Sequence, residues 1–214
     1  MKTIRVTGTA RAALRPDLTV VTMTLQGTAP EYSEALNRAS RDAQTLRDVL
    51  ERLHFKREEL KTISFFVNTD YESYEESGVW KQRFKGYRFE HLLKVSFDSE
   101  NERLGEVLTA LANAAVSPML QISYEVKDPE SAKTPLLARA VADAREKAQL
   151  LAVAAGAKLQ ELQSVDYSSG EVRFDACPTH MLDAAMSAKG RIEMNLEPDE
   201  ITIADDVTCV WEME

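Results

Sequence analysis

The chain has 214 residues and a net charge of −9 at pH 7. Its apolar fraction of 44% and its charged fraction of 29% are those of a globular protein that buries a core. The acidic balance disfavours wholesale binding to nucleic acid or to an anionic membrane surface, because both need a basic face.

The sequence also limits where the chain is expected to act. No run approaches the roughly 20 apolar residues of a membrane-spanning helix. The chain begins with a polar, alternating pattern that lacks the apolar centre of an export signal. We therefore expect a cytoplasmic protein, or a periplasmic or secreted one if a leader has been removed. Cys177 and Cys209 are too few for a disulfide framework and are expected to be reduced thiols.

Two stretches with period-two alternation, residues 4–10 and 20–25, predict strands. Between them Arg15-Pro16-Asp17 is typical of a turn, so the two strands are expected to form a hairpin. Gly8 lies alone inside the first strand, whereas a phosphate-binding loop needs several glycines between a strand and a helix. We therefore interpret Gly8 as a bulge, or as a place where another backbone or a helix packs close.

A long helix is predicted over residues 31–53. Its apolar residues recur at spacings of three and four, which gives one buried stripe on an otherwise solvated helix. The stripe consists of Tyr32, Leu36, Ala39, Ala43, Leu46, Leu50 and Leu53.

Two strands are predicted after this helix, over residues 63–67 and 87–97. The acidic segment 71–81 between them is expected to be a hairpin loop. Alternation places six residues on one face of the second strand. They are Tyr87, Phe89, His91, Leu93, Val95 and Phe97.

A second, shorter helix is predicted where Ser99 and Glu102 form the capping-box pattern. Residues 120–126 then alternate as a strand. A third helix ends near Gly156, and it begins either at Asp128-Pro129 or at Thr134-Pro135.

The last part of the chain contains two predicted strands, residues 162–167 and 201–213, separated by an irregular segment over residues 168–199. Segments this long are usually functional or disordered. We expect this one to contact another subunit or a partner, because methionines adapt to irregular surfaces. The candidate contact residues are Met181, Met186 and Met194.

The order of these elements is β-β-α-β-β-α-β-α-β-β. Helices do not separate every pair of strands, so the fold class is predicted to be α+β, with a mixed, mostly antiparallel sheet or sheets. Two long helices and one shorter helix should pack on them. We expect a single domain over residues 1–214, with 168–199 as an irregular insertion.

The residues with reactive side chains do not form a recognisable catalytic, cofactor or metal site. Cys177 and His180 have ligand-like spacing, but a structural zinc site wants a second ligand pair. His91 has a side chain suited to general-base chemistry, yet the sequence places no nucleophile beside it. A small-molecule or enzymatic site near His91 therefore stays an alternative.

A second alternative is binding of RNA or single-stranded DNA by residues 80–89, which interleave cations with aromatics. Lys85, Tyr87 and Arg88 would make the contacts, in a partial match to an RNA-recognition strand motif. Arg88 stands where that motif has a small residue, and residues 4–10 lack the aromatic of the partner strand. Nucleic-acid binding is therefore disfavoured.

Seven segments, taken in order, resemble the SIMPL-domain family, long described as a domain of unknown function. The resemblance covers nearly the whole chain. Many members have glycine after the first helix, where this chain has His54. The segments are VTGTARAALRPDLTVV at 6–21, EALNRASRDAQTLRDVLERL at 34–53, LKTISFFV at 60–67, KGYRFEHLLKVSF at 85–97, ISYEVKDPE at 122–130, ARAVADAREKAQLLAVAAGAKL at 138–159 and PDEITIADDVTCVWEME at 198–214.

The resemblance implies a protein without an established catalytic residue. The family includes bacterial periplasmic proteins linked to oxidative stress, a periplasmic immunogenic protein and an animal protein that associates with a Pelle-like kinase. It also implies large homo-oligomers, ring-like in at least one branch. We therefore expect a non-enzymatic, oligomeric scaffold or protein-interaction module without a cofactor, tied to stress through resemblance alone.

Overall fold

The computed structural model describes residues 2–167, 181–182 and 196–214. The chain divides into two compact units. Unit 1 consists of Met1–Pro16, Val126–Cys177 and Pro198–Glu214, and unit 2 consists of Asp17–Glu125 and Pro178–Glu197. All recorded strand pairs are antiparallel, and the fold class is α+β as predicted. None of the described helices is both long enough and apolar enough to cross a membrane.

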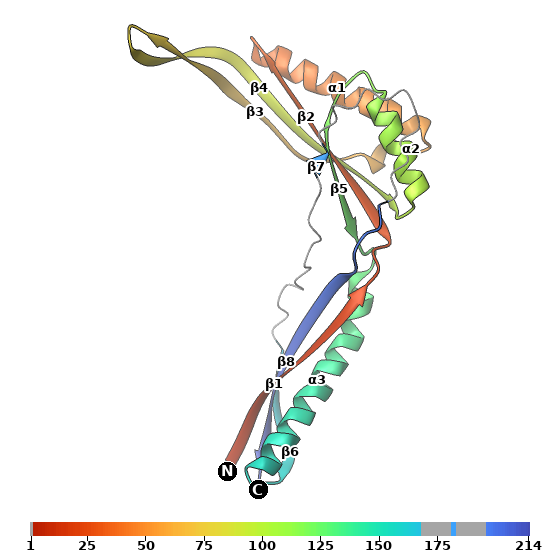
Figure 1. The fold of residues 1–214 in the computed structure, drawn as a ribbon, viewed down its shortest axis with the longest axis vertical. Helices are drawn as coiled ribbons and strands as arrows, with labels where there is room; N and C mark the ends of the chain where they lie inside the picture. Colours follow the sequence, from red (N-terminus) through yellow and green to blue (C-terminus); the bar gives the residue numbers. More distant parts are fainter. Residues whose placement is uncertain (1, 168–180, 183–195) are drawn as a thin grey trace. The chain divides into compact units, whose positions relative to one another are not determined.

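Unit 1 is a three-stranded sheet with one helix along it (Figure 1). The strand order is β1-β8-β6. Asp128 begins the helix, because its side chain accepts a hydrogen bond from the Ser131 N–H and Pro129 takes the first helical position. The structure thus selects the earlier of the two predicted starts. The elements are β1 (Lys2–Leu14), α3 (Pro129–Ala154), β6 (Leu159–Asp166) and β8 (Ile201–Met213).

Helix α3 lies unusually close to strand β1. Its buried residues recur every four positions and are mostly alanines: Leu136, Ala140, Ala144, Ala148 and Ala152. A Cβ at Gly8 would lie 2.0 Å from the carbonyl oxygen of Ala140 and 2.4 Å from the nitrogen of Ala144. Only glycine fits such a contact, which confirms the expectation that a helix packs close at this position.

Unit 2 is a five-stranded sheet in the order β3-β4-β2-β5-β7, with helices α1 and α2 packed against one face (Figure 1). The predicted element order is confirmed, with a short 3₁₀ helix (η1) and the two-residue strand β7 added. The elements are β2 (Leu18–Ala29), α1 (Tyr32–Arg52), η1 (Arg57–Glu59), β3 (Lys61–Glu76), β4 (Val79–Asp98), α2 (Asn101–Ala112), β5 (Met119–Glu125) and β7 (Met181–Leu182).

The chain that follows helix α1 contains a residue with left-handed backbone geometry. His54 has φ of 65°, and the N–H of Phe55 bonds back to the carbonyl of Leu50. This conformation favours glycine, and here it is adopted by a histidine. The predicted stripe of α1 is largely buried, but Tyr32 and Leu36 in its first turns stay exposed.

The predicted hairpin between the first two strands is wrong. β1 pairs with β8 over its whole length, from Lys2 opposite Met213 to Leu14 opposite Ile201. β2 instead lies between β4 and β5 in the other sheet. The turn residues at 15–17 therefore lead from one sheet to the other. The N–H of Asp17 donates to the Glu125 carbonyl at 3.2 Å and thereby joins unit 2.

The predicted loop over residues 71–81 is also wrong. β3 continues to Glu76 and β4 resumes at Val79, so the loop is only two residues long. Ser77 and Gly78 both have positive φ, of 56° and 79°, which is the geometry of the tight turns that match strand twist. The acidic composition of this segment suggested a loop, whereas most of its residues belong to paired strands with their carboxylates at the surface.

Ser99 does not cap the second helix. The residue at the cap is Glu100, without a side-chain cap hydrogen bond. The hydroxyl of the fully buried Thr19 donates to Ser99 Oγ at 3.1 Å. Burial of Thr19 decides this, since a buried hydroxyl needs a partner more than an exposed helix end does.

Candidate interaction surface

The β3–β4 hairpin extends past the rest of its sheet (Figure 1). The last residue of β2, Ala29, pairs with Tyr87, so from Gly86 to the turn β4 pairs only with β3. Gly86 marks the place where the hairpin leaves the sheet. A Cβ on Gly86 would lie 2.4 Å from the carbonyl oxygen of Ala29, at a φ of 147°. Beyond this point both faces of the hairpin lack a covering layer in the part of the chain that the structure describes.

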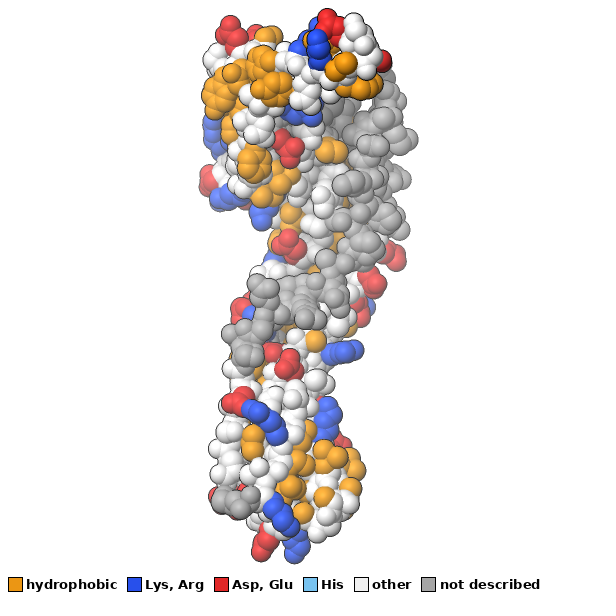
Figure 2. Space-filling model, turned by 90° about the vertical axis from the view of Figure 1, so that its left-hand side faces the viewer, with side chains coloured by type: hydrophobic (Ala, Val, Ile, Leu, Met, Phe, Trp, Pro, Cys, Tyr) orange, Lys and Arg blue, Asp and Glu red, His pale blue; other side chains and the backbone are white. Residues whose placement is uncertain are grey.

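A row of aromatic rings runs along one face of this hairpin. The rings meet edge to face, with centroids 5.9 Å apart for Tyr71 and Phe84, 5.4 Å for Phe84 and Tyr87, and 5.5 Å for Tyr87 and Tyr32 of α1. Tyr71 is 54% exposed and Trp80, nearer the tip, is 71% exposed. Hydrophobic side chains are visible between charged ones on the part of the surface that contains unit 2 (Figure 2).

A bulge creates this aromatic row. The pairing register shifts between Asp70 and Tyr71, so that Asp70 faces Gly86 and Tyr71 faces Phe84, and Lys85 is the extra residue. Phe84 thereby returns to the face that Tyr87 occupies. Strict alternation would put these two rings on opposite faces, so sequence reasoning missed the row. The glycine beside an aromatic was its one available signal.

The three predicted nucleic-acid contacts are not brought onto one face. The Tyr87 ring packs between Tyr32 and Phe84, while Arg88 points to the other face and pairs with Asp70 at 3.2 Å. Lys85 lies in the bulge. The neighbouring cations are also matched by carboxylates, Lys81 by Glu76 and Arg83 by Glu72. A stacking platform needs rings and cations that face the same strand of nucleic acid, and the predicted pair Tyr87 and Arg88 lies on opposite faces of this hairpin.

His91 is packed into the sheet rather than into a cleft. Its Nε2 lies 3.0 Å from Thr62 Oγ1, and its ring meets the edge of Phe65 at 5.1 Å. Nδ1 is buried and has no hydrogen-bond partner among the described residues. Burial lowers the pKa of His91, and the positive charge of Arg47 lowers it further. The neighbour of Nε2 is the Thr62 hydroxyl, and among the described residues no group orients the imidazole from Nδ1, as the base of a catalytic pair requires.

Of the three predicted contact methionines, the structure describes the backbone of Met181 alone. Met181 belongs to β7, where its backbone pairs with Gln121 of β5. Met186 and Met194 lie outside the described residues, as do Cys177 and His180. The role of these methionines in subunit or partner contacts therefore stays a prediction. Within the described ranges no three residues of metal-binding type are grouped closely enough to hold an ion.

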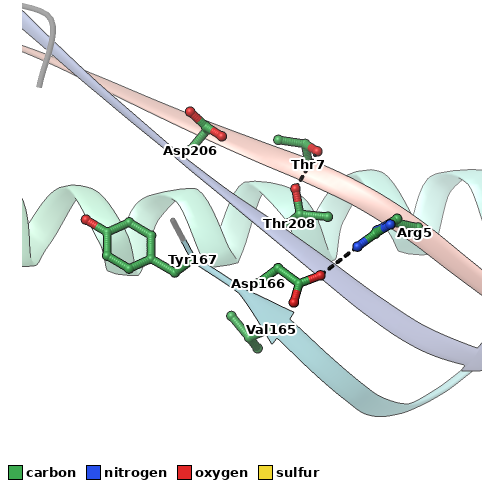
Figure 3. Close-up of a pocket in the computed structure, with 7 residues that line it drawn as sticks. All are labelled: Arg5, Thr7, Val165, Asp166, Tyr167, Asp206 and Thr208. Carbon is green, nitrogen blue, oxygen red and sulfur yellow. Dashed lines mark hydrogen bonds and ion pairs between the residues drawn. The ribbon is translucent and has the colours of Figure 1, made fainter. Parts of the chain in front are cut away.

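An open hollow lies on the face of the unit 1 sheet opposite α3 (Figure 3). Arg5 and Asp166 form an ion pair across it at 2.6 Å, and the hydroxyls of Thr7 and Thr208 bond each other at 2.8 Å. Asp206 also lines it. The polar groups at the centre of the hollow thus bond one another. Because the ion pair is also exposed to water, where such pairs contribute little energy, we expect the hollow to bind a ligand weakly.

The outer strands of the two sheets differ in whether a side chain bonds to their unpaired backbone groups. On the free edge of β1, the Thr9 N–H donates to Asp143 of α3 at 2.7 Å, and Lys147 bonds the same carboxylate oxygen at 2.6 Å. A charged side chain on an unpaired backbone group protects a strand edge from further pairing. No such contact is recorded for β3 or β6, whose outer edges are open in the described structure.

Replacing Asp143 by asparagine should change how stability depends on pH. The hydrogen bond from Lys147, and after it the bond from Thr9, lowers the pKa of the Asp143 carboxyl. The contribution of the carboxylate is therefore present above about pH 4, and it is lost as pH falls through the lower pKa of the folded state. Urea unfolding of wild type and Asp143→Asn should differ most above about pH 4 and converge below it. Glu146→Gln, on the same helix, should keep the wild-type profile, and parallel curves for Asp143→Asn would refute the assignment.

Comparison with known proteins places the whole fold in one family. A search of curated proteins found no match to this chain. The model of the SIMPL family, described as a protein of unknown function (DUF541), matches residues 4–211. That range includes both units and the β3–β4 hairpin. The chain therefore belongs to the SIMPL (DUF541) family.

Proposed function

We propose that this chain is a non-enzymatic scaffold that associates with other copies of itself through the β3–β4 hairpin. The exposed aromatic row of the hairpin carries the proposal. Tyr71, Phe84 and Trp80 lie outside the buried core of unit 2, and each is about half exposed or more. Aromatic side chains are enriched at protein interfaces, and clustered exposed ones mark interaction sites.

The open edge of β3 supports the same surface. Ile63, Phe65 and Phe66 of this strand are exposed on both of its faces. Residues 63–67 of β3 form an apolar run with unpaired backbone groups, and such a run invites pairing with another chain. The edge of β1 carries the Asp143 carboxylate on its backbone, whereas no such contact is recorded for β3 in the described structure. A second copy bound along β3 would pair these open backbone groups and so remove the risk of non-specific strand pairing.

The proposal extends to the setting in which the scaffold acts. The resemblance to SIMPL proteins linked to oxidative stress supports a role in a stress response. The surroundings of His91 and the polar hollow in unit 1 favour a structural role over catalysis. Among the described residues no group on Nδ1 orients the imidazole beside the Thr62 hydroxyl, and the polar groups of the hollow bond one another.

Light scattering coupled to size exclusion tests this proposal. Wild type should elute as an assembly whose mass falls on dilution, and the variant Tyr71→Ser/Phe84→Ser should be monomeric at the same concentration. Both side chains are about half exposed, so the variant should remain folded by circular dichroism. A monomeric wild type at all concentrations would refute the proposal.

A matched control lies on the other open edge. Leu162 and Val165 of β6 are exposed to nearly the same degree as Phe84. Leu162→Ser/Val165→Ser should keep the mass of the wild-type assembly. If this control dissociates as fully as the hairpin variant does, the hairpin is not the specific surface.

A further inference from the structure

We propose that two copies of the chain join by antiparallel pairing of their β3 strands, with Asn68 of each copy at the two-fold axis. This inference rests on the proposed self-association and specifies its strand, direction and register. β3 is the outermost strand of its sheet, and its 16 residues form the longest open edge among the described residues. A row of unpaired N–H and C=O groups is satisfied best by another extended backbone.

The distribution of charge along β3 favours the antiparallel direction. The strand begins with Lys61, which pairs across to Lys94. It ends in the carboxylates of Glu72, Glu75 and Glu76, of which the first and last also pair with cations of β4. Antiparallel pairing places the basic start of one copy beside the acidic end of the other, twice by symmetry. Parallel pairing would bring like charges together. A two-fold axis also makes the contact self-complementary, as closed dimers require.

The register follows from the aromatic side chains. With Asn68 on the axis, Phe65 of one copy lies opposite Tyr71 of the second copy, and the same pair forms again across the axis. Phe65 is 40% and Tyr71 is 54% exposed, and both share the face of His91 and Phe84. The aromatic row of each copy would then continue into the other copy. Aromatic pairs directly across two strands are among the more stabilising ones.

The same register also determines which residue of the second copy lies opposite Lys61. Ile63 is the extra residue of a bulge, because Thr62 pairs with Leu93 while Ser64 pairs with Leu92. Lys61 therefore falls opposite Tyr74 of the second copy, on the same face as its neighbours Glu72 and Glu76. Lys61 is exposed and has no ion-pair partner among the described residues. In this register it lies near Glu72 and Glu76 of the second copy, which also pair with Arg83 and Lys81 of their own chain.

Disulfide trapping tests the register. The background is Cys177→Ser, which leaves only the buried Cys209. Asn68→Cys in this background should form a covalent dimer on mild oxidation, seen on a non-reducing gel, because the two positions face each other. Ser73→Cys is the matched control. Ser73 is also exposed, but in this register the two Ser73 residues are offset by ten positions, about 33 Å along the strands, and should not cross-link.

Charge reversal gives an independent measurement. Lys61→Glu should raise the dissociation constant of the assembly about tenfold or more, since two attractive contacts become repulsive. Efficient trapping at Ser73, or none at Asn68 in an assembly that Tyr71→Ser/Phe84→Ser still dissociates, would overturn the register and leave the proposed function intact. An unchanged affinity in Lys61→Glu would also overturn it. A wild type that is monomeric throughout would overturn both proposals.

Discussion

Replacing Gly8 by alanine is expected to lower the free energy of unfolding of unit 1 by about 3 kcal/mol, the upper part of the range for overpacked cores. The added Cβ would overlap the backbone of α3, at 2.0 Å from the Ala140 carbonyl oxygen and 2.4 Å from the Ala144 nitrogen. Backbone atoms cannot move aside as a flexible side chain does, so α3 must shift away from β1. Urea unfolding followed by circular dichroism measures the loss.

Two control variants separate this steric effect from a general sensitivity of β1. Thr7→Ala, on the opposite face of the strand, loses one exposed hydroxyl contact and should cost under about 1 kcal/mol. Gly8→Ala/Ala144→Gly removes the Ala144 Cβ at 2.7 Å but leaves the Ala140 oxygen in place. It should therefore not restore stability. Recovery in this double variant would show that side chains, rather than the backbone, limit the space at Gly8.

Phe89→Ala is expected to be the most damaging substitution in unit 2, at about 3–5 kcal/mol. Phe89 is fully buried and is among the largest side chains in the core between the sheet and α1. Its ring also lies 2.5 Å from where a Cβ on Gly27 would be, so the neighbouring strand is shaped around it. Truncation leaves a cavity that this rigid sheet cannot close. Denaturant unfolding of the purified variant would show the loss.

Phe66→Ala provides the matched comparison, because it removes the same side chain from a site that is 54% exposed. Measured in a dilute solution where copies are apart, its effect should stay below about 1 kcal/mol. Equal losses at Phe66 and Phe89 would mean that Phe66 is covered within a single chain. Its exposure would then be no argument for a second copy on β3.

The hairpin joins these stability arguments to the proposed function. Along β4, Tyr87 is the last residue toward the turn whose side chain packs against the core of unit 2. The side chains between Tyr87 and the turn lie outside this core and can contribute to an interface. Substitutions at Tyr71, Phe84 or Lys61 should therefore affect association while leaving unfolding nearly unchanged. Substitutions at Phe89 should do the reverse until the chain unfolds.

The sequence predicted most elements because each is encoded locally. The period of three and four in residues 31–53 and the alternation in residues 87–97 depend only on which face is apolar, and both were confirmed. The ordered segments also identified the family, which the match over residues 4–211 confirms. The isolated glycine at position 8 already indicated a close approach, though not of which helix.

The tertiary structure decided which elements meet. β1 alternates as β2 does, so nothing local distinguishes a β1–β2 hairpin from the observed pairing of β1 with β8, some 200 residues away. The candidate surface was likewise not predictable from local alternation, because the extra residue Lys85 places Phe84 on the face of Tyr87. Alternation fixes which side chains share a face only while the register is unbroken. Pairing partners and bulges depend on contacts between distant segments, and for this reason only the fold revealed the aromatic row and the open edge of β3.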